Sequence, residues 1–294
     1  GSGNFVAGST AGDSIVSGGD NNTLVGTNAG TAVTTGDFNT ALGSQALAQT
    51  NTAGQNTAIG GYAMYYNTTG ANNTAVGLQA LLDNTTGSNN VATGMDALAN
   101  NTTGTENVSV GANSMLANTT GSYNTSVGYN ALDANTTANN GTAVGRAALT
   151  TNTTGANNTA IGMSALEGNT TGSESCAVGY RALTTQTGAG EVNNALGADA
   201  LRLTTTGQAN NAMGHSALEN NTTASYNTAI GHRSMTSNST GATNTAIGAY
   251  ALQANTTASE NTAVGDYALS ANTTGTGNCA LGRQALNNNT TASN

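Results

Sequence analysis

The chain has 294 residues, of which 40 are glycine, none is proline or tryptophan, and only 6% are charged. Its formal net charge is −9, and five scattered arginines without any lysine cannot neutralise a row of phosphates, which excludes nucleic acid as a partner. No basic run addresses anionic lipid and no apolar run has the length of a membrane-spanning helix, so we expect no membrane insertion of this segment.

One pattern repeats from the first residues to the last. A glycine that follows a small aliphatic residue returns every 17 residues between Gly8 and Gly282, except for two steps of 18, from Gly8 to Gly26 and from Gly179 to Gly197. The consensus is N-T-A-[VI]-G-x-x-A-L-x-x-N-T-T-G-x-x. A fixed period of this length is typical of a solenoid rather than of a disordered polar chain.

The repeats are less regular at the start of the chain. Residues 1–33 form two degenerate coils in which Gly12 and Gly30 take the place of the usual Leu or Met, as expected of a terminal, cap-like segment. Residues 34–294 carry the regular coils and belong to the same continuous domain.

Within a coil, the pattern predicts two short strands and two turns. N-T-A-[VI]-G has the β-branched residues of a strand, A-L is the centre of a second strand, and N-T-T-G is a turn. We therefore predict an all-β parallel β-solenoid, or β-roll, of about seventeen coils with 17 residues each.

The side chains of a strand alternate between its two faces. We expect Val76 and Thr74 to point inward with Leu81, and Ala75 to point outward. Two alternatives account for the small Ala75 and Ala80 rows, namely a chain–chain interface and crowding within the coil.

Two columns of asparagine recur. The first opens the strand and is predicted to form a buried ladder of amides that bond from coil to coil; it comprises Asn56, Asn73, Asn90, Asn107, Asn124, Asn158, Asn227, Asn244 and Asn261. The second opens N-T-T, where it either bonds turn backbone or accepts N-linked glycans; it comprises Asn67, Asn84, Asn101, Asn118, Asn135, Asn152, Asn169, Asn221, Asn238, Asn255, Asn272 and Asn289.

Neither the cysteines nor the titratable residues predict a reactive site. Cys176 and Cys279 replace the Thr that we place inward, six coils or about 29 Å apart, so they are free thiols or pair across a trimer axis. His215 and His232 are expected to stack about 5 Å apart without a third metal ligand. The acidic residues scatter without a recurring pair, so we expect no enzyme, catalytic residue, metal or cofactor.

The motif N-T-A-[VI]-G-x-x-A-L resembles the head repeats of trimeric autotransporter adhesins over nearly the whole chain. Similar repeats occur in phage fibres and in large secreted bacterial proteins. The resemblance implies a left-handed parallel β-roll, assembly into trimers, and binding to host matrix or other surfaces.

The expected function is that of an extracellular structural or adhesive fibre at a cell or virion surface. Its partners would be copies of itself, as a homotrimer or an end-to-end polymer, and a glycan or cell-surface ligand, with a glycan coat as a further hypothesis. The alternative is a carbohydrate- or surface-binding module of a phage or cell-surface fibre that uses a strip of Tyr residues. Ice binding by the stacked Thr85 and Thr86 rows is a minor alternative.

Overall fold

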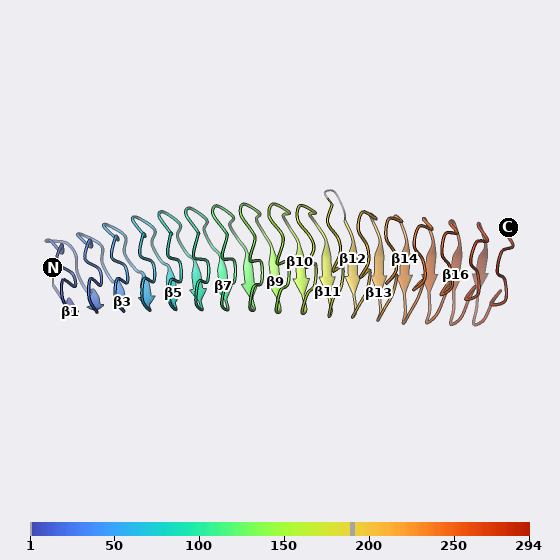
Figure 1. Cartoon of the computed structure of the whole chain (residues 1–294), viewed down its shortest axis with the longest axis horizontal. Coiled ribbons are helices and arrows are strands. Elements are labelled where there is room, and N and C mark those ends of the chain that lie inside the picture. The colour runs from blue at the N-terminus through green and yellow to red at the C-terminus, as the bar shows by residue number, and fades with distance from the viewer. Residues whose placement is uncertain (1, 189–191) are drawn as a thin grey trace. The chain divides into compact units, whose positions relative to one another are not determined.

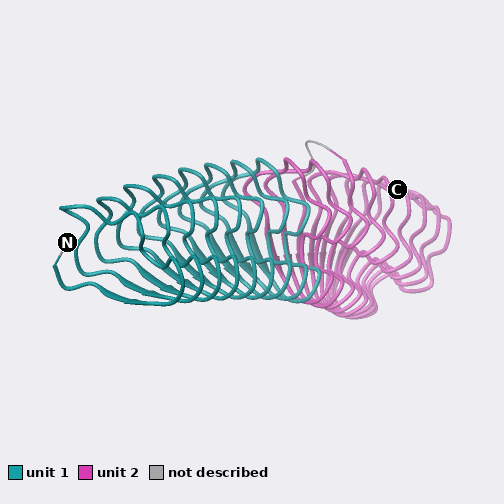
Figure 2. Ribbon diagram, turned by 60° about the vertical axis from the view of Figure 1, so that its left-hand side comes forward, with its two compact units in different colours: residues 1–147 teal, residues 148–294 magenta. Residues whose placement is uncertain are grey.

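A computed structural model describes residues 2–188 and 192–294, and these residues form two compact units, 1–147 and 148–294 (Figure 2). Each unit is a parallel β-solenoid with one three-residue strand per coil, as Figure 1 shows. The described residues contain no helix, and therefore none with the length and hydropathy that crossing a bilayer requires. The solenoid fold predicted from the period is confirmed.

The strands lie 17 residues apart, apart from the two 18-residue steps. Unit 1 contains β1 (Phe5–Ala7), β2 (Thr23–Val25), β3 (Thr40–Leu42), β4 (Thr57–Ile59), β5 (Thr74–Val76), β6 (Val91–Thr93), β7 (Val108–Val110), β8 (Thr125–Val127) and β9 (Thr142–Val144). Unit 2 contains β10 (Thr159–Ile161), β11 (Cys176–Val178), β12 (Asn194–Leu196), β13 (Asn211–Met213), β14 (Thr228–Ile230), β15 (Thr245–Ile247), β16 (Thr262–Val264) and β17 (Cys279–Leu281).

Within each unit, every strand pairs in parallel with the strand of the next coil. The register sets equivalent residues side by side, so that Ala58 of β4 pairs with Ala75 of β5. Because this register is kept through each unit, one repeat position becomes one continuous column of side chains.

The strands face the opposite way from the prediction. Ala75 is fully buried, whereas Thr74 and Val76 on either side of it are partly exposed. Ala80 and Leu81 are also fully buried and occupy the interior beside the strand. The interior is narrow, so the regular coils carry only Ala or Ser at the strand's middle position. Crowding within the coil therefore accounts for the two Ala rows, and the chain–chain interface expected at these alanines is wrong.

The second predicted strand is absent from the described coils, where A-L lies in consecutive turns. Gln79 and Leu81 both adopt left-handed backbone conformations, with φ of +57° and +53°, and equivalent residues do so in other coils. A left-handed conformation costs about 1–2 kcal/mol per residue. It reverses the chain sharply enough to bring Leu81 back against the inner face of the strand.

Glycine permits the closest approach between coils. Gly94 has φ of +134°, and a Cβ atom placed on it would lie 2.6 Å from the backbone carbonyl carbon of Gly111 in the next coil. Only glycine fits where two backbones meet in this way. The same arrangement explains why this glycine marks the repeat.

Candidate functional site

The outward side chains of the strands form two columns, which we call the threonine column and the aliphatic column, and together the outer strip. The threonine column comprises Phe5, Thr23, Thr40, Thr57, Thr74, Val91, Val108, Thr125 and Thr142 in unit 1, and Thr159, Cys176, Asn194, Asn211, Thr228, Thr245, Thr262 and Cys279 in unit 2. The aliphatic column comprises Ala7, Val25, Leu42, Ile59, Val76, Thr93, Val110, Val127 and Val144, and Ile161, Val178, Leu196, Met213, Ile230, Ile247, Val264 and Leu281.

The outer strip sets a column of aliphatic side chains beside a column that is mostly threonine, and it is uncharged and accessible. Leu42 is 49% exposed and Met213 is 50% exposed, far more than the interior Leu81 at 0%. No charged residue occupies an outward position on any of the described strands. Solvent-facing sheet surfaces are normally polar, so the exposed aliphatic column is unusual for a surface left in water.

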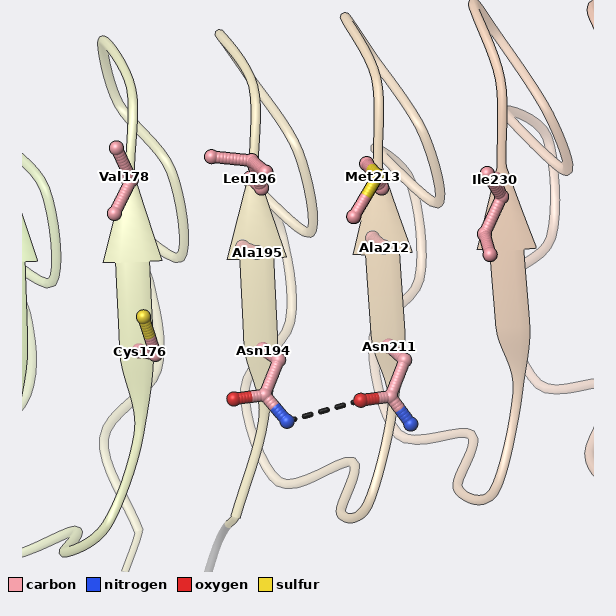
Figure 3. Close-up of a pocket in the computed structure, with 9 residues that line it drawn as sticks. All are labelled: Cys176, Val178, Asn194, Ala195, Leu196, Asn211, Ala212, Met213 and Ile230. Atoms are coloured by element: carbon pink, nitrogen blue, oxygen red, sulfur yellow. Dashed lines mark hydrogen bonds between the residues drawn. The ribbon is translucent and has the colours of Figure 1, made fainter.

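A shallow apolar hollow lies on the strip in unit 2, over β11 to β14 (Figure 3). Val178, Leu196 and Met213 line it on the aliphatic side. On the other side, the Asn194 side chain donates a hydrogen bond of 2.9 Å to Oδ1 of Asn211. Of the residues that line the hollow, only Cys176 carries a titratable side chain.

The two cysteines belong to this strip and not to the interior. Cys176 is half-buried and Cys279 is exposed, and both are free thiols. The inward placement expected for them is wrong, for the same reason that the Thr position points outward. Both thiols are consequently available to a partner that contacts the strip.

The N-T-T asparagines point into the coil. Asn101 is fully buried, and its Nδ2 donates hydrogen bonds to Gly104 O at 3.0 Å and to Oδ1 of Asn84 at 2.8 Å. An N-linked sugar would be attached to this nitrogen, where the folded coil leaves it no room. The same burial, at most 2% exposure, applies to Asn67, Asn84, Asn118, Asn135, Asn152, Asn169, Asn221, Asn238, Asn255 and Asn272, while Asn289 is half-buried.

We therefore expect the folded chain to carry no sugar on these buried asparagines when it is produced in a host that glycosylates N-x-[ST]. Asn100 provides an internal control, because Asn100, Asn101 and Thr102 also form an acceptor pattern and Asn100 is exposed. Peptide mass mapping with and without enzymatic deglycosylation measures both positions together. A sugar on Asn101 in the folded protein would contradict the buried geometry.

The asparagines that open the strands also lie inside. Asn73 is 1% exposed; its backbone N–H donates to Oδ1 of Asn56 at 3.0 Å, and its Nδ2 donates to Gly87 O at 2.8 Å. The column therefore joins each coil to the previous strand and to the following turn. Equivalent bonds are made by Asn90, Asn107, Asn124, Asn227 and Asn244; Asn158 donates to Gly172 O, and Asn261 receives the N–H of Asn278.

Four aromatic side chains form a ladder in unit 2. His215 and His232 stack with ring centres 5.3 Å apart, which confirms the spacing predicted from the sequence. Tyr250 meets His232 edge-on at 5.3 Å and stacks on Tyr267 at 4.7 Å. Among the described residues, no group of three or more His, Cys, Asp and Glu side chains comes close enough together to hold a metal ion.

A small ionic cluster is the main concentration of charge among the described residues. Asp199 lies 3.2 Å from Nε of Arg181, and Arg202 Nη2 lies 2.7 Å from Oε1 of Glu219. Burial raises the pKa of Glu219. Hydrogen bonds from Arg202 and Ser216 and nearby positive charge lower it by a larger amount, so the net shift of the pKa is downward. Burial raises the pKa of Asp83 and Asp133, which lie in different coils and form no acid–base pair.

The lowered pKa of Glu219 gives its ion pair a defined pH dependence. The stabilisation is present above the unfolded pKa of about 4.3 and is lost as the pH falls through the lower folded value. We expect Glu219→Gln to flatten the dependence of the unfolding free energy on pH below this point, and to lower stability at pH 7 by less than about 1 kcal/mol. Urea unfolding across pH measures this, with Glu174→Gln at an exposed position as the control; identical profiles for the two variants would contradict it.

The strand threonines were the surface residues that the sequence reasoning missed. Thr85 and Thr86 do lie in a turn, where the Thr85 hydroxyl donates to Thr102 O at 2.9 Å. The constant size of the Ala75 row was the available signal, because an exposed position does not need to stay small. No protein-family model matches the chain, and the search of curated proteins also finds no match.

Proposed function

We propose that the chain is part of an extracellular structural or adhesive fibre that assembles from copies of itself. The observation that carries this proposal is the regular repetition of one coil, with equivalent residues in register through each unit and internal columns of hydrogen-bonded asparagine. Such a structure lengthens by one nearest-neighbour interface with every added coil. A homotrimer is the preferred assembly, and an end-to-end polymer is the alternative.

Electron microscopy of the purified chain tests this proposal. We expect rods with an axial spacing of about 4.8 Å and, for the homotrimer, threefold symmetry around the rod axis. Particles that grow in length without widening would favour the end-to-end polymer. A chain that remains a single dispersed subunit at every concentration would contradict the fibre.

The aromatic ladder supports a second candidate, a module that binds carbohydrate or another surface. Tyr267 and His232 are exposed, and their rings offer apolar edges beside polar atoms, a combination common at binding surfaces. Glycan-array binding that is lost in the double variant Tyr250→Ala/Tyr267→Ala would favour this function. The exposed Tyr226 precedes the strand rather than following the repeat glycine, and it provides a control as Tyr226→Ala. Equal loss in both variants would count against the ladder.

A further inference from the structure

The outer face of the parallel sheet has no cover within the described coils. In sheets built from β–α–β units the crossover helices cover both faces, whereas the described coils contain no helix. Ala80 and Leu81 cover the inner face, whereas Ile59 and Ile230 on the outer face are 36% and 38% exposed. An uncharged outer face that leaves a column of aliphatic side chains exposed is suited to contact with a partner.

The composition of the outer strip fits the centre of a protein–protein interface. Charged residues are depleted at the centres of such interfaces, while large exposed apolar patches mark binding surfaces. The strip meets both criteria, because its outward positions carry no charge and its aliphatic column is interrupted on the described strands only by Thr93.

We propose that a second copy of the chain covers the outer strip, with the two solenoids parallel and their coils in register. The inference rests on the proposed fibre and identifies the surface through which its subunits associate. The strip repeats once per coil, at a strand spacing of about 4.8 Å. A second copy has the same repeat, so contacts made at one coil recur at the next without a loss of register.

The exceptions in the threonine column favour a parallel arrangement. Val91 and Val108 are adjacent apolar exceptions in unit 1, and Asn194 and Asn211 are adjacent polar exceptions in unit 2. In parallel register, each unit faces its own counterpart, so valine meets valine and amide meets amide. In an antiparallel arrangement the unit 2 amides would face the unit 1 strip, which has no amide at any outward position.

The area of the strip is adequate for a stable interface. A three-residue strand is about 10 Å long and each coil adds about 4.8 Å, so the strips of the two units provide roughly 400 Å² each. A second copy that covered both strips, each with its own counterpart, would bury roughly the 800 Å² per partner of a standard protein–protein interface.

An ordered ice surface is a poorer match. Val91, Cys176 and Asn194 interrupt the threonine column, and the aliphatic column varies from Val to Leu and Met. A rigid lattice requires the same group at every step, whereas the side chains of a second copy adjust to such differences.

The native cysteines make the proposal testable without mutation. Mild oxidation of the purified chain is expected to link Cys176 to Cys176 and Cys279 to Cys279 of another copy. Cleavage after arginine separates these cysteines, because Cys176 lies between Arg146 and Arg181 and Cys279 lies between Arg233 and Arg283. Mass mapping therefore distinguishes like pairs from mixed pairs. Mixed Cys176–Cys279 pairs in the statistical proportion, or no linked copies, would overturn the parallel register.

A charge placed on the strip provides the second test. The double variant Ile59→Glu/Ile230→Glu would set like charges opposite each other, and we expect association to weaken roughly a hundredfold or more while the far-UV circular dichroism is unchanged. The control is Thr86→Glu, which adds a charge at an exposed turn outside the strip. Sedimentation equilibrium measures both variants; equal association of the charged-strip variant and the control would overturn the proposal.

The outcomes separate this inference from the fibre itself. Filaments one solenoid wide, joined end to end, would keep the proposed fibre and refute the strip interface. A monomer at all concentrations would refute both, and a monomer that shapes growing ice crystals would assign the strip to ice instead.

Discussion

Replacing Gly94 with alanine is expected to destabilise unit 1 by about 2–6 kcal/mol. A non-glycine residue at φ +134° has about 1–3 kcal/mol of backbone strain. The added methyl group would also lie 2.6 Å from the carbonyl carbon of Gly111, and overpacking of this kind adds about 1–3 kcal/mol. The two coils cannot separate to relieve the contact without breaking the strand pairing between β6 and β7.

Gly282→Ala is the matched control for this variant. Gly282 has a similar conformation, with φ of +116°, but a Cβ atom there would have no neighbour within 4 Å. The loss of stability in Gly282→Ala should therefore be limited to the contribution from backbone strain. Urea unfolding followed by circular dichroism compares the two variants, and equal losses would show that close approach between coils does not constrain the repeat glycine.

Replacing Asn101 with leucine is expected to have the second large effect. Leucine is similar in size but leaves Oδ1 of Asn84 without its donor and removes the acceptor for the 2.8 Å bond from Asn118 Nδ2. Each buried polar group left unpaired costs about 1–3 kcal/mol, so the unfolding free energy should fall by about 2–6 kcal/mol. The loss of stability is large because the substitution removes hydrogen bonds to the coils on both sides.

The preceding residue provides the control. Asn100 is exposed, and Asn100→Leu makes the same chemical change one position away. We expect this variant to change stability by less than about 0.5 kcal/mol. Hydrogen exchange resolves the difference by coil, because Asn101→Leu should accelerate exchange at Thr102 and Thr119, whereas Asn100→Leu should not. Similar exchange in both variants would show that the buried column contributes little.

The sequence predicted the fold because its period is strict. Stacked coils account for equivalent glycines 17 residues apart, and the predicted strand at Thr74–Val76 is present. The alternation of residues does not show which face of that strand is buried, because in a three-residue segment either the middle residue or the two outer residues can point inward. Assigning the β-branched residues to the interior was wrong, because the space inside was already filled by Leu81.

The prediction of a second strand at A-L was wrong for a different physical reason. Leucine disfavours a left-handed backbone, so nothing in A-L indicates that Leu81 adopts φ of +53°. Packing in the stacked coils overrides this local preference. The outer strip was missed as a direct result of the phase error, whereas the paired histidines were placed correctly because their spacing depends only on the period.

The matching register between coils also affects how the number of coils can change in evolution. A gene that encodes nearly identical segments in tandem tends to gain or lose whole segments when its copies misalign during recombination. Here such an event removes one coil and lets its two neighbours meet through the same surfaces that they already used. The length of the chain can therefore change by whole coils while the register between the remaining coils is kept.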